Sequence, residues 1–148
     1  MGLFDFAKNF GNKIFGKDDD NADASEKLLA HIEDDNPGVE GLAVTVEDGV
    51  ATISGEAEST SAYEKAVLMA GNALGVDSVE ASGLNAPEQE QAYEVTYYEI
   101  QKGDSLWKIA DKFYGNGSKY EKIFEENREV IKDPDKIFAG QKIRIPMD

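Results

Sequence analysis

The sequence predicts an α+β protein in which an N-terminal amphipathic helix precedes two small units, the first of order αββαβ and the second of order βααβ. Three observations support this fold class. Apolar residues recur at helical spacing in some segments and alternate with polar residues in others, so helices and strands are both expected. The length of 148 residues suits two small modules. A polar stretch with Pro87 separates the modules and predicts a linker at residues 85–92.

The N-terminal segment, residues 1–22, is expected to form an amphipathic helix followed by an acidic connector. Its main apolar residues fall on one helical stripe: Leu3, Phe6, Phe10 and Ile14. Such a stripe can lie on a membrane surface or on the protein's own core. The polar face offers only Lys8 and Lys13 to anionic lipid, beside the acidic Asp5. We therefore predict docking onto the core and no stable membrane anchor.

The unit predicted over residues 23–84 begins with a helix and a β-hairpin. Asp23 or Ser25 is expected to cap the helix, because either side chain can accept a hydrogen bond from a backbone N–H of the first turn. The segment LAVTVEDGVATISG alternates on both sides of Asp48-Gly49, a dipeptide typical of a two-residue hairpin turn. This pattern predicts two antiparallel strands after the first helix.

A second helix and a third strand complete this unit. Ser61 and Glu64 have the spacing of a capping box, which predicts a helix that runs to about Leu74. The helix ends in GNALGV, and a short strand through Val79 follows. The expected result is a three-stranded sheet with two helices.

Residues 93–148 predict a strand, two helices and a final strand. The segment EVTYYEI alternates like a strand, and KIRIP forms the last one. Asp104 is expected to cap the first helix and Ser118 the second. Trp107 is expected to pack inside the core of this unit rather than to stack on a sugar.

This last unit closely resembles the LysM family. The resemblance rests on G-D-S-L-W-x-I-A, an aromatic-Gly break, I-x-x-x-N and I-x-x-G-Q-x-I-x-I-P, which this chain matches in type and spacing from Gly103 to Pro146. The family implies a shallow groove between two loops, used for glycans that contain N-acetylglucosamine, such as peptidoglycan. The residues that would form this groove are Gly103, Asp104, Ser105, Ile137, Phe138, Ala139 and Gly140.

The unit at residues 23–84 resembles the BON family of small binding modules, through VEDGVATISGEA and the later GNALGV. A BON unit joined to a LysM unit, behind an N-terminus that begins MGLF, resembles a family of small cytoplasmic BON–LysM proteins of bacteria that bind potassium. That resemblance implies K⁺ as the bound ion and a role as a potassium sensor or buffer, in which the ion favours docking of the two units.

Backbone carbonyls at helix ends are the expected ligands of this ion. Proteins select K⁺ with neutral carbonyl oxygens, whereas clusters of carboxylates suit Ca²⁺ or Mg²⁺. A helix C-terminus supplies unpaired carbonyls and the negative end of the helix dipole. The site is therefore assigned to carbonyls at the ends of the N-terminal helix and of the second BON helix, namely Ala7, Phe10, Gly71, Ala73, Gly75 and Val76. The alternative is an ordinary helix C-cap without an ion.

Charge and composition argue against several other functions. Residues 1–92 carry 5 Lys/Arg against 19 Asp/Glu, a net charge of −14 that repels nucleic acids and anionic membranes. No secretion signal and no membrane span are visible, so we expect a cytoplasmic protein, and a monomer. The chain has no cysteine, and its one histidine, His31, lies in the other unit from Ser105. We therefore predict no enzymatic activity.

Two other functions stay open. With the LysM unit on peptidoglycan and the BON unit on a membrane or a partner, the protein would be a glycan-binding adaptor of the cell envelope. With both units bound to proteins only, it would be a scaffold whose thermal stability responds neither to K⁺ nor to glycan.

Overall fold

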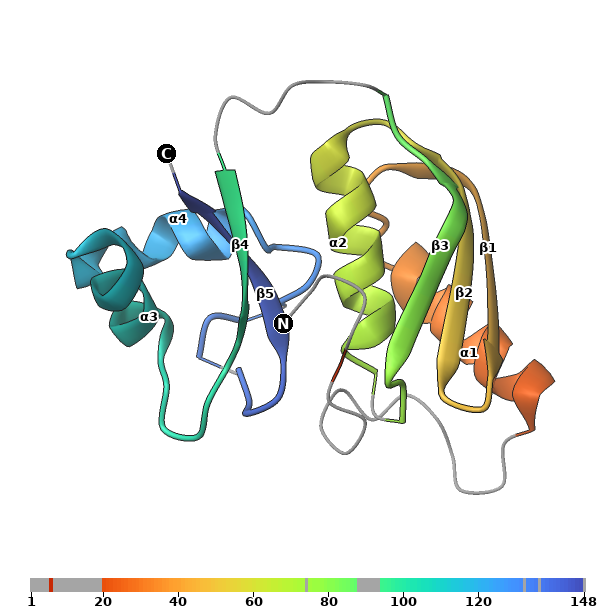
Figure 1. Cartoon of the computed structure of the whole chain (residues 1–148), viewed down its shortest axis with the longest axis horizontal. Helices are drawn as coiled ribbons and strands as arrows, with labels where there is room; N and C mark the ends of the chain where they lie inside the picture. The colour runs from red at the N-terminus through yellow and green to blue at the C-terminus, as the bar shows by residue number, and fades with distance from the viewer. Residues whose placement is uncertain are drawn as a thin grey trace.

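The computed structural model describes residue 6 and residues 20–73, 75–87, 94–131, 133–135 and 137–147 (Figure 1). It has an α+β architecture with two separate sheets, as predicted. The N-terminal unit, residues 20–85, has the predicted order αββαβ. Its elements are α1 (Asn21–Glu33), β1 (Val39–Glu47), β2 (Val50–Ala57), α2 (Thr60–Gly71) and β3 (Ser78–Asn85).

The C-terminal unit, residues 94–147, has the predicted order βααβ, with a short 3₁₀ helix before the second α-helix. The two strands pair antiparallel. Its elements are β4 (Glu94–Glu99), α3 (Leu106–Tyr114), η1 (Gly117–Lys119), α4 (Tyr120–Glu125) and β5 (Lys142–Met147).

The sheet of the N-terminal unit has the strand order β1-β2-β3. β1 and β2 form an antiparallel hairpin, and β3 lies parallel to β2. The hairpin turn is the predicted one, because Asp48 and Gly49 have φ values of 48° and 83°, as a type I′ turn requires. Parallel pairing of β2 with β3 needs a crossover, and α2 supplies it.

The start of α1 differs from the prediction. The side chain of Asp20 accepts a hydrogen bond from the N–H of Asp23 at 2.8 Å, so Asp20 is the cap and the predicted caps, Asp23 and Ser25, are wrong. Several neighbouring side chains in this acidic stretch can cap a helix, and the sequence pattern does not select among them. Ser25 lies inside the helix, where its hydroxyl accepts from the N–H of Val46 in β1.

The start and the end of α2 differ as well. Ser59 is its cap and accepts from the N–H of Ala62 at 3.0 Å, so the capping box predicted from Ser61 is wrong. Glu64 takes no part in capping, because its side chain is buried between the two units. The helix ends at Gly71, earlier than predicted.

Both predicted caps in the C-terminal unit, Asp104 and Ser118, are wrong, although each lies within two residues of the actual cap. α3 is capped by Ser105, whose hydroxyl accepts a first-turn N–H, whereas Asp104 accepts from the hydroxyl of Tyr98. The next turn begins at Asn116, whose side chain accepts from the N–H of Ser118.

α2 lies between the two sheets (Figure 1). One side of the helix packs on β2 and β3, and another packs on β5 of the C-terminal unit. The run from Ala66 to Gly71 is therefore buried without a break. A helix that is apolar on all sides is typical of such a position. The buried residues of the two units form one continuous hydrophobic cluster around it.

β5 is buried from Lys142 to Pro146 because both of its faces are covered. Successive side chains of a strand point to opposite faces. Lys142 and Arg144 face α2 and the N-terminal unit, as their contacts with Phe6 and Glu64 show. The alternating residues Ile143 and Ile145 belong to the opposite face, which α3 and α4 cover.

Trp107 does not pack in the core as predicted. Its side chain is 54% exposed. The buried residues of α3 are Leu106, Ile109 and Ala110, and Trp107 lies off that stripe. Its indole lies on Gly117, where a Cβ would stand 2.2 Å from the ring.

Candidate functional site

The turn that follows α2 contains those predicted carbonyl ligands that the structure describes. They are Gly71, Ala73, Gly75 and Val76. Asn72 caps the helix, and its N–H donates into the last helical turn. The N–H of Val76 donates to the carbonyl of Ala73 at 3.1 Å, which closes a tight turn. Gly75 has a φ of 101°, a conformation that residues with a Cβ avoid.

Three other carbonyls of this turn accept no hydrogen bond from the described residues. Within the described part of the chain, no donor is hydrogen-bonded to the carbonyl oxygens of Gly71, Gly75 or Val76. These oxygens follow the C-terminus of α2, where the helix dipole is negative. The other two predicted ligands, Ala7 and Phe10, lie outside the described residues.

The donor set of the turn suits a monovalent cation. Its oxygens are neutral, which fits K⁺ better than Ca²⁺ or Mg²⁺. The carboxylate next in sequence, Asp77, lies beside the β1–β2 turn, since a Cβ on Gly49 would be 3.3 Å from its Oδ1. Among the described residues, no group of three His, Cys, Asp or Glu side chains is placed to hold a metal ion.

Phe6 connects the N-terminal segment to this turn. Its N–H donates to the carbonyl of Asp77 at 2.9 Å, and its side chain is buried. The ring lies so close to Gly71 that a Cβ there would stand 2.1 Å from the Cζ of Phe6. A glycine is therefore required at position 71 because the Phe6 ring packs so closely against it, and not because of its φ. This burial agrees with the predicted docking of the apolar stripe, whose other members lie outside the described residues.

Asn72 joins the turn to the C-terminal unit. Its side-chain amide donates to the carbonyl of Lys142 at 2.7 Å, and its side-chain oxygen accepts from the N–H of Lys142 at 2.7 Å. Both residues are buried. The Lys142 ammonium lies 4.3 Å from the centroid of the Phe6 ring. The turn, the N-terminal segment and β5 thus meet at one place.

Charged side chains attach the first half of α2 to the C-terminal unit. The Nε of Arg144 lies 3.4 Å from Oε2 of Glu64, and its Nη1 lies 2.7 Å from Oε2 of Glu126. The side chain of Arg144 is 1% exposed and that of Glu64 is 3% exposed. Lys65 and Glu129 form a further ion pair at 2.9 Å. These pairs connect α2 to β5 and to the segment that follows α4.

Tyr97 of β4 lies beside this buried ion pair. Burial and the neighbouring carboxylate of Glu64 hold the pKa of Tyr97 above its ordinary value. The phenol is therefore neutral at physiological pH and hydrogen-bonds to Glu64.

The sequence patterns do not indicate these interface residues: Glu64, Asn72, Lys142 and Arg144. The alternation in KIRIP predicts a strand of the C-terminal unit and indicates no partner for its polar face. One signal was available, because the almost uninterrupted apolar run of α2 leaves no side for solvent and so requires a second packing partner.

The predicted groove residues form two connected loops in the C-terminal unit. Gly103 and Gly140 have φ values of 88° and 91°, and each lies at a turn. The N–H of Gly140 donates to the carbonyl of Ile100 at 2.8 Å, which brings the second loop to the base of the first. Ile137, Phe138 and Ala139 lie in this second loop.

A cavity of about 340 Å³ lies next to the first of these loops. Its lining residues are Ser105, Leu106, Trp107, Tyr120, Pro134 and Asp135. Ser105 is the predicted groove residue among them. The second wall is formed by Pro134 and Asp135 rather than by the predicted segment from Ile137 to Gly140.

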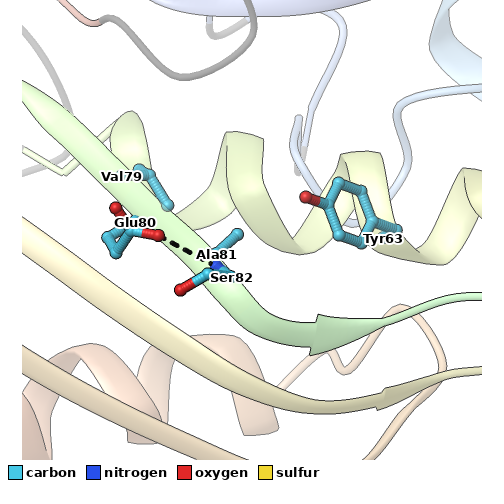
Figure 2. Close-up of a pocket in the computed structure, with 5 residues that line it drawn as sticks. All are labelled: Tyr63, Val79, Glu80, Ala81 and Ser82. Atoms are coloured by element: carbon cyan, nitrogen blue, oxygen red, sulfur yellow. Dashed lines mark hydrogen bonds between the residues drawn. The ribbon is translucent and has the colours of Figure 1, made fainter.

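A second cavity, of about 360 Å³, lies between α2 and β3 and is shown in Figure 2. Tyr63 reaches it from α2, and Glu80 lines it from β3. Burial, with a smaller contribution from Glu80, raises the pKa of Tyr63. Glu80 accepts from the N–H of Ser82 at 3.1 Å. None of the predicted ligands lines this cavity.

No helix in the described part of the chain is both long enough and apolar enough to span a membrane.

Comparison with protein families and with curated proteins gives matches over both units. The BON domain family matches residues 19–84, and the LysM domain family matches residues 98–146. The potassium binding protein Kbp of Escherichia coli O6:H1 is 35% identical over 150 residues, which cover 99% of this chain and 99% of that protein.

Two further relatives share only part of the chain. An uncharacterized protein of Deinococcus radiodurans is 35% identical over 102 residues, 64% of this chain and 40% of its own length. The uncharacterized protein YqbP of Bacillus subtilis is 41% identical over 58 residues, 33% of this chain and 26% of its own length. Of these three relatives, the E. coli protein is the one that matches this chain over nearly its whole length.

Proposed function

Because the chain belongs to the BON–LysM family that includes the potassium binding protein Kbp, we propose that it binds K⁺ at the turn that follows α2. The observation that carries the proposal is the set of carbonyls at this turn, of which those of Gly71, Gly75 and Val76 accept no hydrogen bond from the described residues. Gly71, Ala73, Gly75 and Val76 would hold the ion from α2, and Ala7 and Phe10 would complete the site from the N-terminal segment.

The position of this turn links ion binding to docking. It lies where α2, Phe6 and β5 meet, and Asn72 joins it directly to Lys142. A ligand stabilises whichever state binds it, so K⁺ would favour the arrangement in which the two units are docked. The acidic N-terminal half would raise the local concentration of cations without supplying ligands. A potassium sensor or buffer in the cytoplasm, without enzymatic activity, is the function that follows.

Calorimetric titration of the full chain tests this function. KCl is compared with NaCl at matched ionic strength, and scattering reports the radius of gyration. We expect saturable binding of K⁺ that is at least about tenfold tighter than that of Na⁺, with a decrease in the radius of gyration. Equal weak heats for the two ions, with no compaction, would refute the proposal.

A matched pair of variants locates the binding. Gly75→Ala has space for a methyl group but forces an alanine into a φ of 101°, so it should weaken K⁺ binding. Trp107→Ala alters the C-terminal unit far from the turn in sequence and should leave K⁺ binding unchanged. Loss of K⁺ binding in Trp107→Ala alone would place the ion in the C-terminal unit.

Glycan binding is the second candidate, and one observation favours it. Trp107 is 54% exposed beside the 340 Å³ cavity, and an exposed aromatic at a cavity is common in binding sites. Under this function the wild type would be retained on purified peptidoglycan, Trp107→Ala would not, and the protein would be found in the envelope fraction. If neither protein were retained, glycan binding would be refuted and potassium binding would remain as the proposed function.

A further inference from the structure

Lys142 is a buried cation beside the proposed ion site. Its residue exposure is 1%, and its ammonium lies 4.3 Å from the centroid of the Phe6 ring. A buried ammonium is costly unless surrounding charges, dipoles or rings compensate for the lost water. The fold therefore maintains a positive charge inside the interface between the two units.

Two contacts fix the location of this charge. The backbone of Lys142 is hydrogen-bonded in both directions to Asn72, the residue that caps α2. The ring beneath the ammonium belongs to Phe6, which packs against Gly71 at the end of the same helix. The ammonium thus lies at the C-terminus of α2, where the helix dipole is negative.

A lysine ammonium and K⁺ are stabilised by the same surroundings. Both carry a single positive charge, and both are favoured by a helix C-terminus and by the face of an aromatic ring. We propose that Lys142 is an internal competitor of the bound ion, whose ammonium supplies the positive charge at the end of α2 in the absence of K⁺ and so sets the affinity for K⁺. This inference rests on the proposed function.

The expected size of the competition is large enough to measure. An ion bound about 8 Å from the ammonium, at an effective dielectric constant of about 20, would be repelled enough to change its dissociation constant by tenfold or more. The repulsion opposes the attraction of the acidic N-terminal half, whose net charge is −14 over residues 1–92. A sensor needs an affinity close to the concentration of its ligand, and an internal competitor lowers affinity without altering the ligands.

Three variants of the full chain separate charge from packing. Lys142→Met removes the charge and keeps a long apolar side chain, and the Asn72 hydrogen bonds survive because they join the backbone. Lys142→Arg keeps the charge. Lys112→Met is the control, because it removes a lysine that also lies over an aromatic ring, 4.9 Å from that of Tyr98 in the C-terminal unit.

Titration with KCl in a constant background of choline chloride gives the dissociation constants. We expect Lys142→Met to bind K⁺ about tenfold or more tightly than the wild type, a change of about 1.4 kcal/mol. Lys142→Arg and Lys112→Met should stay within about threefold of the wild type. Tighter binding by Lys142→Met alone, even with no detectable binding by the wild type, supports the competition.

Other outcomes overturn the inference in different ways. Equal affinities of the wild type and Lys142→Met refute it and leave the proposed function intact. Tighter binding by both Lys142 variants would assign the effect to packing and would also refute the inference. Absence of K⁺-specific binding in both the wild type and Lys142→Met refutes the proposed function and the inference together.

A measurement on the wild type decides the question if the variants do not fold. The ¹⁵Nζ NMR signal of Lys142 reports the surroundings of its ammonium directly. We expect this signal to move on addition of KCl and to remain in place at an equal concentration of NaCl. A signal that KCl does not move would overturn the inference.

Discussion

The two ends of α2 are joined to the C-terminal unit by different chemistry. Near the N-terminal end, Glu64 and Arg144 form a buried ion pair, and Lys65 pairs with Glu129 nearby. At the C-terminal end, Asn72 forms hydrogen bonds with Lys142 and Phe6 packs on Gly71, beside carbonyls that accept no hydrogen bond from the described residues. One end has its own counter-charges, and the other has oxygens that can accept a cation.

This difference divides docking into two contributions. The N-terminal end of α2, here called the charged end, forms ion pairs whose two partners both belong to the protein. Its contribution to docking therefore needs no ligand. The carbonyl end lies at the negative pole of the helix, and its stability is the one that a bound ion can raise. The consequence is that damage to the charged end should lower stability with or without K⁺, whereas damage to the carbonyl end should change the response to K⁺.

The largest expected effect comes from breaking the charged end. Arg144→Met leaves the buried carboxylate of Glu64 without its guanidinium partner, so we expect a loss of about 3–5 kcal/mol in the free energy of unfolding. Urea denaturation, with and without KCl, measures this loss, which should be similar in both conditions.

Arg128→Met is the control for this variant. Arg128 pairs with Glu125 on the surface, where both side chains are 58% exposed, so its loss should lower the free energy of unfolding far less than the loss of Arg144. Adding Glu64→Gln to Arg144→Met should recover part of the stability. Similar small losses in Arg144→Met and Arg128→Met would contradict the structural role of the buried pair.

The C-terminal end of α2 is tested by Gly71→Ala, which places a methyl group where the Phe6 ring now packs. In Gly71→Ala the new Cβ would stand 2.1 Å from Phe6 Cζ, so the ring must leave its site. We expect a loss of about 2–3 kcal/mol from exposure of the ring, together with K⁺ binding at least about tenfold weaker. Thermal unfolding and KCl titration measure the two effects.

Gly117→Ala is matched to this change, because its Cβ would stand 2.2 Å from the Trp107 ring in the C-terminal unit. That variant should leave K⁺ binding unaltered, since Trp107 is exposed and distant from the turn in sequence. If both variants weakened K⁺ binding equally, the special role of Gly71 would be wrong.

Two asparagines bind β5 in the same manner and provide the next test. Asn72 bonds the N–H and carbonyl of Lys142 from the N-terminal unit, and Asn127 bonds those of Arg144 from within the C-terminal unit. Asn72→Ala should cost about 2 kcal/mol and Asn127→Ala about as much. Hydrogen exchange distinguishes them, because only Asn127→Ala should loosen α4. Equal loosening of α4 in both would mean that Asn72 supports more than docking.

The smallest effect is expected from pH. The folded-state pKa of Tyr97 is raised above 10, chiefly by burial and then by Glu64, so the folded state favours the neutral phenol. Its contribution to stability is complete below pH 10 and is lost as pH rises above that value. Urea midpoints at about pH 8 and about pH 10.5 should therefore differ more in the wild type than in Tyr97→Phe. An identical difference in both proteins would contradict the placement of the Tyr97 phenol beside Glu64.

The order of the elements was accessible from the sequence because local patterns determine it. The Asp48-Gly49 turn and the break at Gly115 need backbone conformations that their residue types favour, and the structure has both. Helix starts were less accessible. Asp20, Ser59, Ser105 and Asn116 cap the helices, each close in sequence to an equally suitable residue that was predicted instead.

The interface was not accessible by the same means. Glu64 fits a capping box by spacing, but tertiary packing buries it against Arg144 from the other unit. Lys142 and Arg144 alternate with isoleucines, a pattern typical of a strand with one face in water, yet α2 covers that face. Of the candidate site, the turn from Gly71 to Val76 follows from its glycines, whereas Phe6, Asn72 and Lys142 meet it only through the fold.

A residue-resolved NMR titration of the full chain with KCl, against NaCl at the same ionic strength, tests the central claim most directly. We predict saturable, K⁺-specific shifts in the turn from Gly71 to Val76, which extend to Asn72 and Lys142. Glu64 and Arg144 should change little. Shifts that are the same for both ions, or that lie mainly on surface carboxylates, would contradict a carbonyl site for K⁺ at the end of α2.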